Sequence, residues 1–352
     1  MIPPGETIGI LGGGQLGRML AMAAAQLGYR AHIYAPEPNS IAAEVCGGFT
    51  CAGWDDAEAL ARFAADCAVI TYEFENVPVT PLTALGATPL FAHPRALETA
   101  QERVSEKRFV EKLGGCPARW AAVDSPADLA AAITSIGTPG VLKTRRDGYD
   151  GKGQWRIMSP GDAAGLDLPA TPLIYEQFIN FRAEFSVLLC RGADGDLRFW
   201  DTPENIHRSG ILSTSALPAS AFVQSQVAEA RALASKVAES LDYVGVLTLE
   251  FFATEAGPVF NEMAPRVHNS GHWTIEGAIT SQFENHIRAI CGLPLGDTAL
   301  AASGVVMSNL IGDEVHDWAQ ILRDPANHLH LYGKAAARPG RKMGHVTRLI
   351  LE

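Results

Sequence analysis

A glycine-rich turn near the start of the chain constrains its fold more than any other feature. Gly12-x-Gly14-x-x-Gly17 follows a strand predicted over residues 7–11 and begins a helix predicted over residues 15–27. The alternation continues, with strands predicted at 31–34, 69–71 and 89–91 and a helix at 57–65. Strands that alternate with helices favour a parallel sheet with crossover helices, so this part of the chain predicts an α/β domain.

The same turn leaves three interpretations of its function open. With Glu37, which lies 20 residues beyond Gly17, it matches the dinucleotide-binding fingerprint, in which a phosphate approaches the N-terminus of a helix. It also suits contact with another phosphate or ligand, because Gln15 can reach a polar group at the start of the helix. The third interpretation is a tight turn that binds no ligand.

Composition narrows the class of protein. The length of 352 residues suggests two or three domains, and a formal net charge of −11 argues against binding to nucleic acid or an anionic membrane surface. We see no apolar run long enough to span a membrane and no signal peptide. The six cysteines form no C-x-x-C pair, which favours reduced thiols and predicts a cytoplasmic protein.

The later sequence combines a second glycine-rich loop with many short strands. Residues 140–144 are predicted to form a strand that carries Lys143 into the loop 147–153, whose three glycines and lysine suit either a phosphate or a flexible hairpin. Further strands are predicted at 155–158, 174–178, 184–190, 197–200, 246–252 and 259–263. Helices are predicted at 104–113, 128–136, 222–241 and 274–290, the last with Ile279, Phe283, Ile287 and Ile290 on one apolar stripe.

Two glutamates on the last two of these strands, Glu250 and Glu262, are the most informative polar residues. In a hairpin centred on residue 256 they would face each other, at roughly 5 Å between Cβ atoms, among apolar neighbours. Facing carboxylates in such surroundings repel each other, and Mg²⁺, which prefers carboxylates together with nucleotide phosphates, relieves that repulsion. Asn261 would add an oxygen only if a bulge turned it to the same face. The alternative is a shared proton, or pairing with a base such as Arg266.

Three further polar clusters have both functional and structural interpretations. Residues 72–76 follow a predicted strand, where parallel sheets bind ligands, but a solvated loop fits equally. Residues 266–273 place His268 and His272 four residues apart, which suits an anion or substrate better than zinc because no third ligand is evident. A basic group near the end of the chain suits a substrate phosphate or a solvated face, and consists of Lys334, Arg338, Arg341 and Lys342.

Taken together, these motifs resemble the 5-(carboxyamino)imidazole ribonucleotide synthases, a family of ATP-grasp enzymes. Residues 12–19, 71–76, 148–154, 261–273 and 340–345 carry the resemblance, in order along essentially the whole chain. It implies an α/β fold, α+β in the later domains, with a Rossmann-like domain (1–100), a small ATP-grasp lid domain (101–172) and a large ATP-grasp domain with a basic C-terminal segment (173–352). Asp147 departs from the family pattern, which commonly has glycine there.

The implied reaction is the ATP-dependent carboxylation of 5-aminoimidazole ribonucleotide by bicarbonate in purine biosynthesis. It passes through carboxyphosphate and releases ADP and phosphate. ATP and Mg²⁺ are the implied cofactors, the ribonucleotide and bicarbonate are the implied substrates, and the implied assembly is a homodimer without nucleic acid or membrane.

The family pattern also assigns site residues. ATP contacts fall on Arg103, Lys143, Gly148, Tyr149, Asp150, Gly151, Lys152, Gly153, Gln154, Glu176, Gln177, Phe178, Ile179, Glu184, His207, Asn261 and Glu262. Mg²⁺ falls on Glu250 and Glu262. The ribonucleotide falls on Gly14, Gln15, Leu16, Glu73, Arg266, Asn269, Lys334 and Arg341. The residues implied in catalysis are Tyr149, Arg266, His268 and Lys342.

Three other activities stay open at this point. A ligase of the same fold that activates formate or an amino acid would need a different acceptor site, which the run at 266–273 disfavours. A dehydrogenase that uses NAD would leave Glu250 and Glu262 without a role. A binding protein without catalysis would hold nucleotide but release no ADP.

Overall fold

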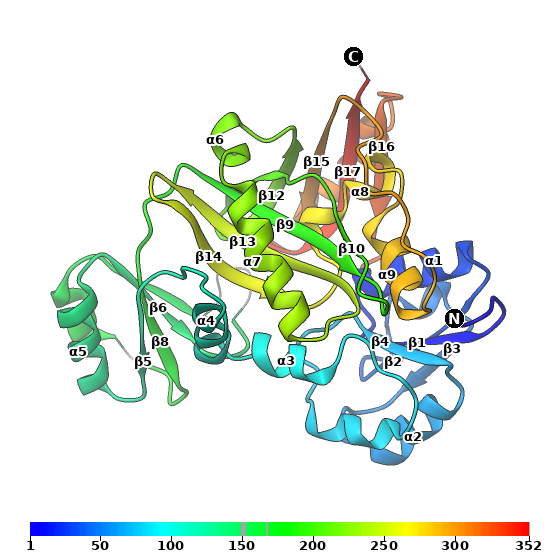
Figure 1. Ribbon diagram of the computed structural model, residues 1–352, viewed down its shortest axis with the longest axis horizontal. Helices are drawn as coiled ribbons and strands as arrows, with labels where there is room; N and C mark the ends of the chain where they lie inside the picture. Colours follow the sequence, from blue (N-terminus) through cyan, green and yellow to red (C-terminus); the bar gives the residue numbers. More distant parts are fainter. Residues whose placement is uncertain (149–152, 167, 352) are drawn as a thin grey trace.

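The computed structural model describes residues 1–148, 153–166 and 168–351, and these form three sheets (Figure 1). The N-terminal sheet is parallel, in the order β3-β2-β1-β4. Its strands are β1 Thr7–Leu11, β2 Arg30–Ala35, β3 Gly48–Cys51 and β4 Val69–Tyr72, and its helices are α1 Gln15–Gln26 and α2 Ala57–Ala65. The predicted parallel α/β domain is therefore confirmed.

The strand predicted at 89–91 is wrong. Only Leu90 pairs with the sheet, as a single bridge to Ile70. The chain turns away because Pro94 begins the helix α3 Pro94–Ala100, which is capped by the His93 side chain. The helix α4 Arg103–Lys112 follows and leads out of the N-terminal domain.

A small antiparallel sheet in the order β5-β8-β6-β7 forms the second part. It consists of β5 Trp120–Val123, β6 Gly140–Thr144, β7 Gln154–Ile157 and β8 Leu173–Gln177, with the helix α5 Pro126–Ile136. Leu142, Ile157 and Tyr175 belong to its own hydrophobic core. Since β8 pairs with β5 and β6, the small sheet continues beyond residue 172, the end expected for this domain.

The third sheet has nine strands and runs from β14 at one edge to β16 at the other. Its members are β9 Ala183–Arg191, β10 Leu197–Phe199, β11 Glu204–Arg208, β12 Ile211–Leu217, β13 Gly245–Thr254, β14 Gly257–Ala264, β15 Gly304–Ile311, β16 Asn327–Leu331 and β17 Lys342–Ile350. The C-terminal strands β15, β16 and β17, which were not predicted, therefore extend the large sheet and carry Lys342 on it.

Two helices predicted as single are each broken. Residues 222–241 form α6 Ala221–Gln224 and α7 Val227–Ser240, which a turn at 225–226 separates. At this turn the Gln226 side chain donates to the Thr254 carbonyl at 3.0 Å. Residues 274–290 form α8 Thr274–Gly277 and α9 Gln282–Ile290, because Ser281 caps α9. Ile279 lies in the break and is 62% exposed, so its place on the apolar stripe is wrong. The short helix α10 Trp318–Ile321 lies near β16.

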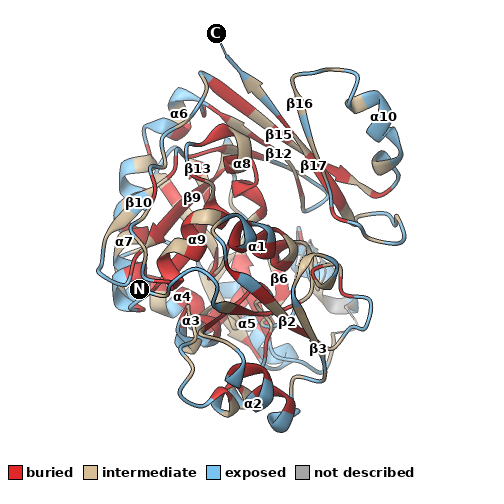
Figure 2. Cartoon of the chain, turned by 90° about the vertical axis from the view of Figure 1, so that its right-hand side faces the viewer, coloured by how far each residue is buried: buried red, intermediate tan, exposed pale blue. Residues whose placement is uncertain are grey.

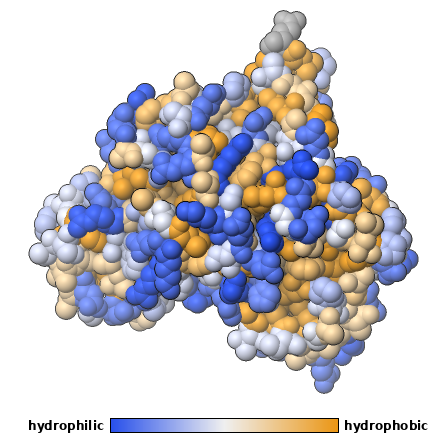
Figure 3. Space-filling model, in the orientation of Figure 1, coloured by the Kyte–Doolittle hydropathy of each residue, from blue (hydrophilic) through white to orange (hydrophobic). Residues whose placement is uncertain are grey.

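Buried residues join the N-terminal domain to the large sheet. Helix α1 packs against α9, and both contribute to one hydrophobic core with β9 and β13 (Figure 2). Within this contact His286 Nε2 lies 2.8 Å from Thr71 Oγ1, while His286 Nδ1 accepts the Val246 N–H at 3.1 Å. The joined parts enclose a region rich in hydrophilic side chains in the middle of one face (Figure 3). Among the described helices, none is long and apolar enough to cross a membrane.

Candidate active site

Three neighbouring cavities lie where the sheets meet. The first, of about 400 Å³, lies between the small sheet and the β13–β14 hairpin, and the second, of about 160 Å³, lies between that hairpin and the N-terminal domain. Glu250, Glu262 and Arg103 line both. The third, of about 270 Å³, lies beside the first glycine-rich turn. Two ligands bound in the first two cavities would therefore meet at the pair of glutamates.

The β13–β14 hairpin places these glutamates opposite each other, as predicted. The predicted centre of the hairpin is wrong, however, because Thr254 pairs with Gly257 and Phe251 with Phe260. In that register Asn261 would face Glu250. A bulge shifts the register between Glu250 and Phe251, which makes Asn261 the extra residue and brings Glu262 opposite Glu250. Asn261 then lines the first cavity beside both glutamates.

The two carboxylates have different surroundings. Burial first, and then the neighbouring Glu262, raises the pKa of Glu250 to about 7. Burial alone would also raise the pKa of Glu262, but Arg103, with its Nη1 3.0 Å from Glu262 Oε2, and Lys143 lower it below its ordinary value. Burial and the facing Glu262 both disfavour a charged Glu250, and a cation bound at the pair would relieve the repulsion between the two carboxylates.

Among the described residues, no cluster of three or more His, Cys, Asp or Glu side chains could hold a metal ion by itself. Two carboxylates and the Asn261 amide suit a hard cation that takes its remaining oxygens from nucleotide phosphates, as Mg²⁺ does. The donor set therefore fits the predicted Mg²⁺, with Glu250 and Glu262 as its holders.

A buried ion-pair network forms the floor of the first cavity. Lys143 Nζ lies 2.9 Å from Glu176 Oε2, and Lys107 Nζ lies 3.3 Å from Glu176 Oε1. Burial alone would raise the pKa of Glu176, but Lys107, Lys143 and Arg103 lower it to about 2. Burial lowers the pKa of Lys143. The network thus presents buried positive charge beside a cavity large enough for a nucleotide.

The described residues that the family pattern assigns to ATP line one cavity, with one exception. Those that line the first cavity are Arg103, Lys143, Gly148, Gln154, Glu176, Gln177, Phe178, Ile179, Glu184, His207, Asn261 and Glu262. Gly153 is absent from the described lining of that cavity. Residues 149–152, which include the predicted Tyr149, Asp150, Gly151 and Lys152, lie outside the described residues. The adjacent Asp147 has a φ of 59°, a conformation that glycine adopts more readily.

His207 and the aromatic side chains complete the first cavity. His207 Nδ1 lies 2.7 Å from Glu184 Oε2, and this contact raises the pKa of His207 although burial lowers it. Phe181 and Phe252 stack with their ring centroids 4.6 Å apart and both line the cavity. Flat apolar surfaces beside polar donors suit a purine base and its ribose.

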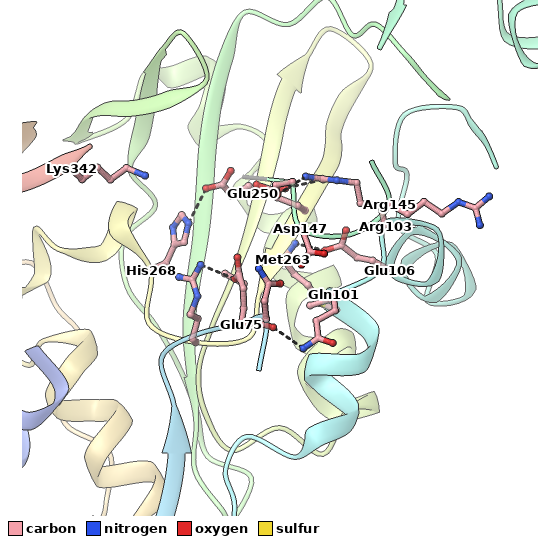
Figure 4. Close-up of a pocket in the computed structure, with 16 residues that line it drawn as sticks. Glu75, Gln101, Arg103, Glu106, Arg145, Asp147, Glu250, Met263, His268 and Lys342 are labelled. Carbon is pink, nitrogen blue, oxygen red and sulfur yellow. Dashed lines mark hydrogen bonds and ion pairs between the residues drawn. The ribbon is translucent and has the colours of Figure 1, made fainter. Parts of the chain in front are cut away.

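Arg266, His268 and Lys342, three of the four residues predicted for catalysis, line the second cavity, and the fourth, Tyr149, lies outside the described residues (Figure 4). Arg266 Nη2 lies 2.7 Å from Glu75 Oε2, and His268 Nε2 lies 3.3 Å from Glu250 Oε1. Burial, Arg266 and Lys342 lower the pKa of His268 well below its ordinary value, so its ring is neutral near pH 7. Lys342 lines the same cavity from β17. Two cationic side chains, Arg266 and Lys342, therefore line the same cavity as the glutamate pair.

The third cavity contains part of the predicted ribonucleotide set. Gly14, Glu73, Lys334 and Arg341 line it, and the Gly14 N–H donates to Glu73 Oε1 at 2.7 Å. Gly12 has a φ of 118°, and a Cβ there would lie 2.6 Å from Glu73 Oε1, so this turn requires glycine.

The other predicted ribonucleotide residues lie nearby but differ in exposure. Leu16 is buried in the core, so only its backbone can reach a ligand, and Gln15 is half-buried at the start of α1. Asn269 is buried, and among the described residues neither of its amide atoms has a hydrogen-bond partner.

The family pattern assigned no role to Glu75, Glu106 or Lys107. Glu75 and Glu106 line the second cavity, and Lys107 belongs to the ion-pair network. Glu75 lay within a noted motif, whereas Glu106 and Lys107 lay in a helix predicted only as charged and amphipathic. Their burial, which marks them as unusual, is not visible in the sequence.

Comparison with known proteins first defines the class. Residues 5–101 match the ribonucleotide synthetase preATP-grasp domain, residues 108–283 the ATP-grasp domain, and residues 305–350 the phosphoribosylaminoimidazole carboxylase C-terminal domain. With the cavity described above, these matches identify the chain as an ATP-grasp ligase, which uses ATP.

Similar proteins then define the family. A Brucella melitensis protein named N5-carboxyaminoimidazole ribonucleotide synthase is 49% identical, over 99% of this chain and 97% of its own length. The structure of an N5-carboxyaminoimidazole ribonucleotide synthetase with ADP is 42% identical with a TM-score of 0.94, over 99% of this chain and 93% of that one. An Aspergillus clavatus synthase with ADP and 5-aminoimidazole ribonucleotide is 31% identical with a TM-score of 0.90, over 98% and 93%. The chain belongs to the N5-carboxyaminoimidazole ribonucleotide synthase family.

Proposed function

We propose that the chain carboxylates 5-aminoimidazole ribonucleotide with bicarbonate at the expense of ATP, in purine biosynthesis. The observation that carries the proposal is the Glu250–Glu262 pair, which lies between the cavity that holds the ATP residues and the cavity that holds Arg266, His268 and Lys342. A phosphoryl group bound at this pair would reach an acceptor in the second cavity without leaving the protein.

In the first step a bicarbonate oxygen attacks the γ-phosphorus of ATP, the bond to the β-phosphate breaks, and ADP leaves. Lys143 and Arg103 offset the charge that spreads over the transferred phosphoryl oxygens. Mg²⁺ held by Glu250 and Glu262 would neutralise phosphate charge and orient the nucleotide. The product of this step, carboxyphosphate, is labile, so the cavity has to exclude water.

In the second step the amine of the ribonucleotide bonds to the carboxyl carbon and phosphate leaves. Arg266, fixed by Glu75 at 2.7 Å, and Lys342 hold the anionic carboxyl species in the second cavity. The neutral His268 ring is the acceptor that we assign to the proton lost by the amine. Lys334 and Arg341, beside the glycine-rich turn, suit the phosphate of the ribonucleotide.

A coupled assay for ADP release, in which each substrate is omitted in turn, tests this function. We expect ADP release only when ATP, Mg²⁺, bicarbonate and 5-aminoimidazole ribonucleotide are all present. ADP release that continues at the same rate without bicarbonate, or without the ribonucleotide, would refute the proposal. The homodimer and the cytoplasmic location stay predictions. Size-exclusion chromatography with light scattering would test the homodimer.

A further inference from the structure

Strand β14 lies at the edge of the large sheet, and its outer side faces helix α4 (Figure 1). An edge strand has backbone groups that no neighbouring strand pairs. Along the bulged part of β14, three such groups have partners from outside the sheet. The Phe260 N–H donates to the Cys116 carbonyl at 2.9 Å, the Met263 N–H donates to Glu106 Oε1 at 2.7 Å, and Lys107 Nζ donates to the Asn261 carbonyl at 3.4 Å.

Glu106 and Lys107 are almost completely buried, at 2% and 1% exposure. Burying ionisable groups is costly, and replacing such groups by apolar residues often leaves a protein equally stable. Their presence therefore calls for a role beyond packing. Burial raises the pKa of Glu106 to about 8, so near pH 7 it is largely a neutral acid that accepts the Met263 N–H.

The bulge decides which residue faces Glu250. Without it, the register that begins at the turn would continue and place Asn261 opposite Glu250. The observed shift places Glu262 there instead. Glu106 and Lys107 contact the two residues that flank Glu262 in the chain, so they hold the backbone on both sides of it.

We propose that Glu106 and Lys107 are positioning residues, which hold the bulged segment of β14 so that Glu262 faces Glu250 in the geometry needed to bind a magnesium nucleotide. This inference rests on the proposed function, because the proposed function assigns the metal to that pair. Supporting groups of this kind typically change metal affinity about 10–100-fold when they are removed.

The test compares substitutions at Glu106 by titrating Mg²⁺ at fixed ATP and measuring ADP release. Glu106→Leu removes the acceptor, and we expect about tenfold more Mg²⁺ for half-maximal activity. Glu106→Gln keeps an acceptor oxygen, and we expect a Mg²⁺ requirement within about twofold of the wild type. If Glu106→Leu does not fold, Glu106→Ala removes the same acceptor.

The matched control is Val110→Ala, which removes buried volume from the same helix but removes neither of the two side-chain hydrogen bonds to β14. We expect it to lower stability but leave the Mg²⁺ requirement unchanged. The inference is overturned if Glu106→Leu and Glu106→Ala need no more Mg²⁺ than the wild type, if Glu106→Gln is as impaired as Glu106→Leu, or if Val110→Ala shows the same shift.

A second measurement separates this inference from the proposed function. Calorimetric binding of ADP at several Mg²⁺ concentrations reports the metal site whether or not carboxylation occurs. Loss of the Mg²⁺ effect on ADP affinity in Glu106→Leu would support the positioning role even if the wild type released no ADP with bicarbonate. Equal Mg²⁺ effects in the two proteins would overturn it even if the wild type carboxylated the ribonucleotide.

Discussion

Replacing Glu176 by glutamine should lower the free energy of unfolding, because Glu176 is the carboxylate at the centre of the ion-pair network. The carboxylate lies 3.3 Å from Lys107 Nζ and 2.9 Å from Lys143 Nζ, and its side chain is 5% exposed. Although burial opposes them, these cations and Arg103 lower its pKa from 4.5 to about 2. At 1.36 kcal/mol per pKa unit this difference corresponds to about 3 kcal/mol of stability at pH 7. Glutamine keeps the shape but removes the charge that offsets the two buried ammonium groups.

Urea unfolding at pH 7 measures this loss. We expect the free energy of unfolding to fall by about 3 kcal/mol in Glu176→Gln. The control is Asp124→Asn, which breaks an ion pair of 2.9 Å to Arg145 whose carboxylate is 63% exposed, and it should cost less than about 1 kcal/mol. Because the pKa of Glu176 is lowered, its contribution to the free energy of unfolding is present above pH 4.5 and disappears as the pH falls towards 2. A loss at pH 7 no larger than that of the control would refute the reasoning.

Three further predictions concern other parts of the molecule. Glu262→Gln should abolish Mg-ATP turnover while leaving the circular dichroism spectrum unchanged, and near-normal turnover would remove Glu262 from the metal site. Burial lowers the pKa of His286 to about 4, so protonation of the unfolded chain should reduce stability by about 2 kcal/mol between pH 7 and pH 5. In His286→Gln, the free energy of unfolding measured with urea should change by about 2 kcal/mol less between pH 7 and pH 5 than in the wild type. Gly12→Ala places a Cβ 2.6 Å from Glu73 Oε1 at a φ of 118°, so the KM for the ribonucleotide should rise at least about tenfold; an unchanged KM would show that the turn adapts.

The N-terminal domain could be predicted well because its signals are local. Short apolar runs, the glycine turn and the caps lie within a few residues of the elements that they define, and β1 and α2 match their predicted bounds. The strands β3, β5, β11, β12, β15, β16 and β17 were not predicted. Several of them carry polar or partly exposed residues, and they form strands because neighbouring strands pair with them. The pairing of β12 with β15 joins segments that are far apart in the chain.

The candidate site was predicted unevenly for a related reason. The Glu250–Glu262 pairing is correct although the assumed centre of the hairpin is wrong, because the bulge at Asn261 shifts the register by one residue after the turn. The sequence of β14 contains no residue that predicts this bulge. The partners that hold it, Glu106 and Lys107, lie more than 150 residues earlier, and only the folded chain brings them to the strand edge.

Arg103 couples the proposed binding of the metal ion to the proposed binding of the nucleotide phosphates. Its Nη1 lies 3.0 Å from Glu262 Oε2, and it lines both cavities. A cation held by Glu262 would offset the negative charge that Arg103 now offsets, which would leave the guanidinium available to a phosphate oxygen. Binding of the metal and binding of the phosphates should therefore favour each other. The metal replaces Arg103 as the partner of Glu262, and the phosphate replaces Glu262 as the partner of Arg103.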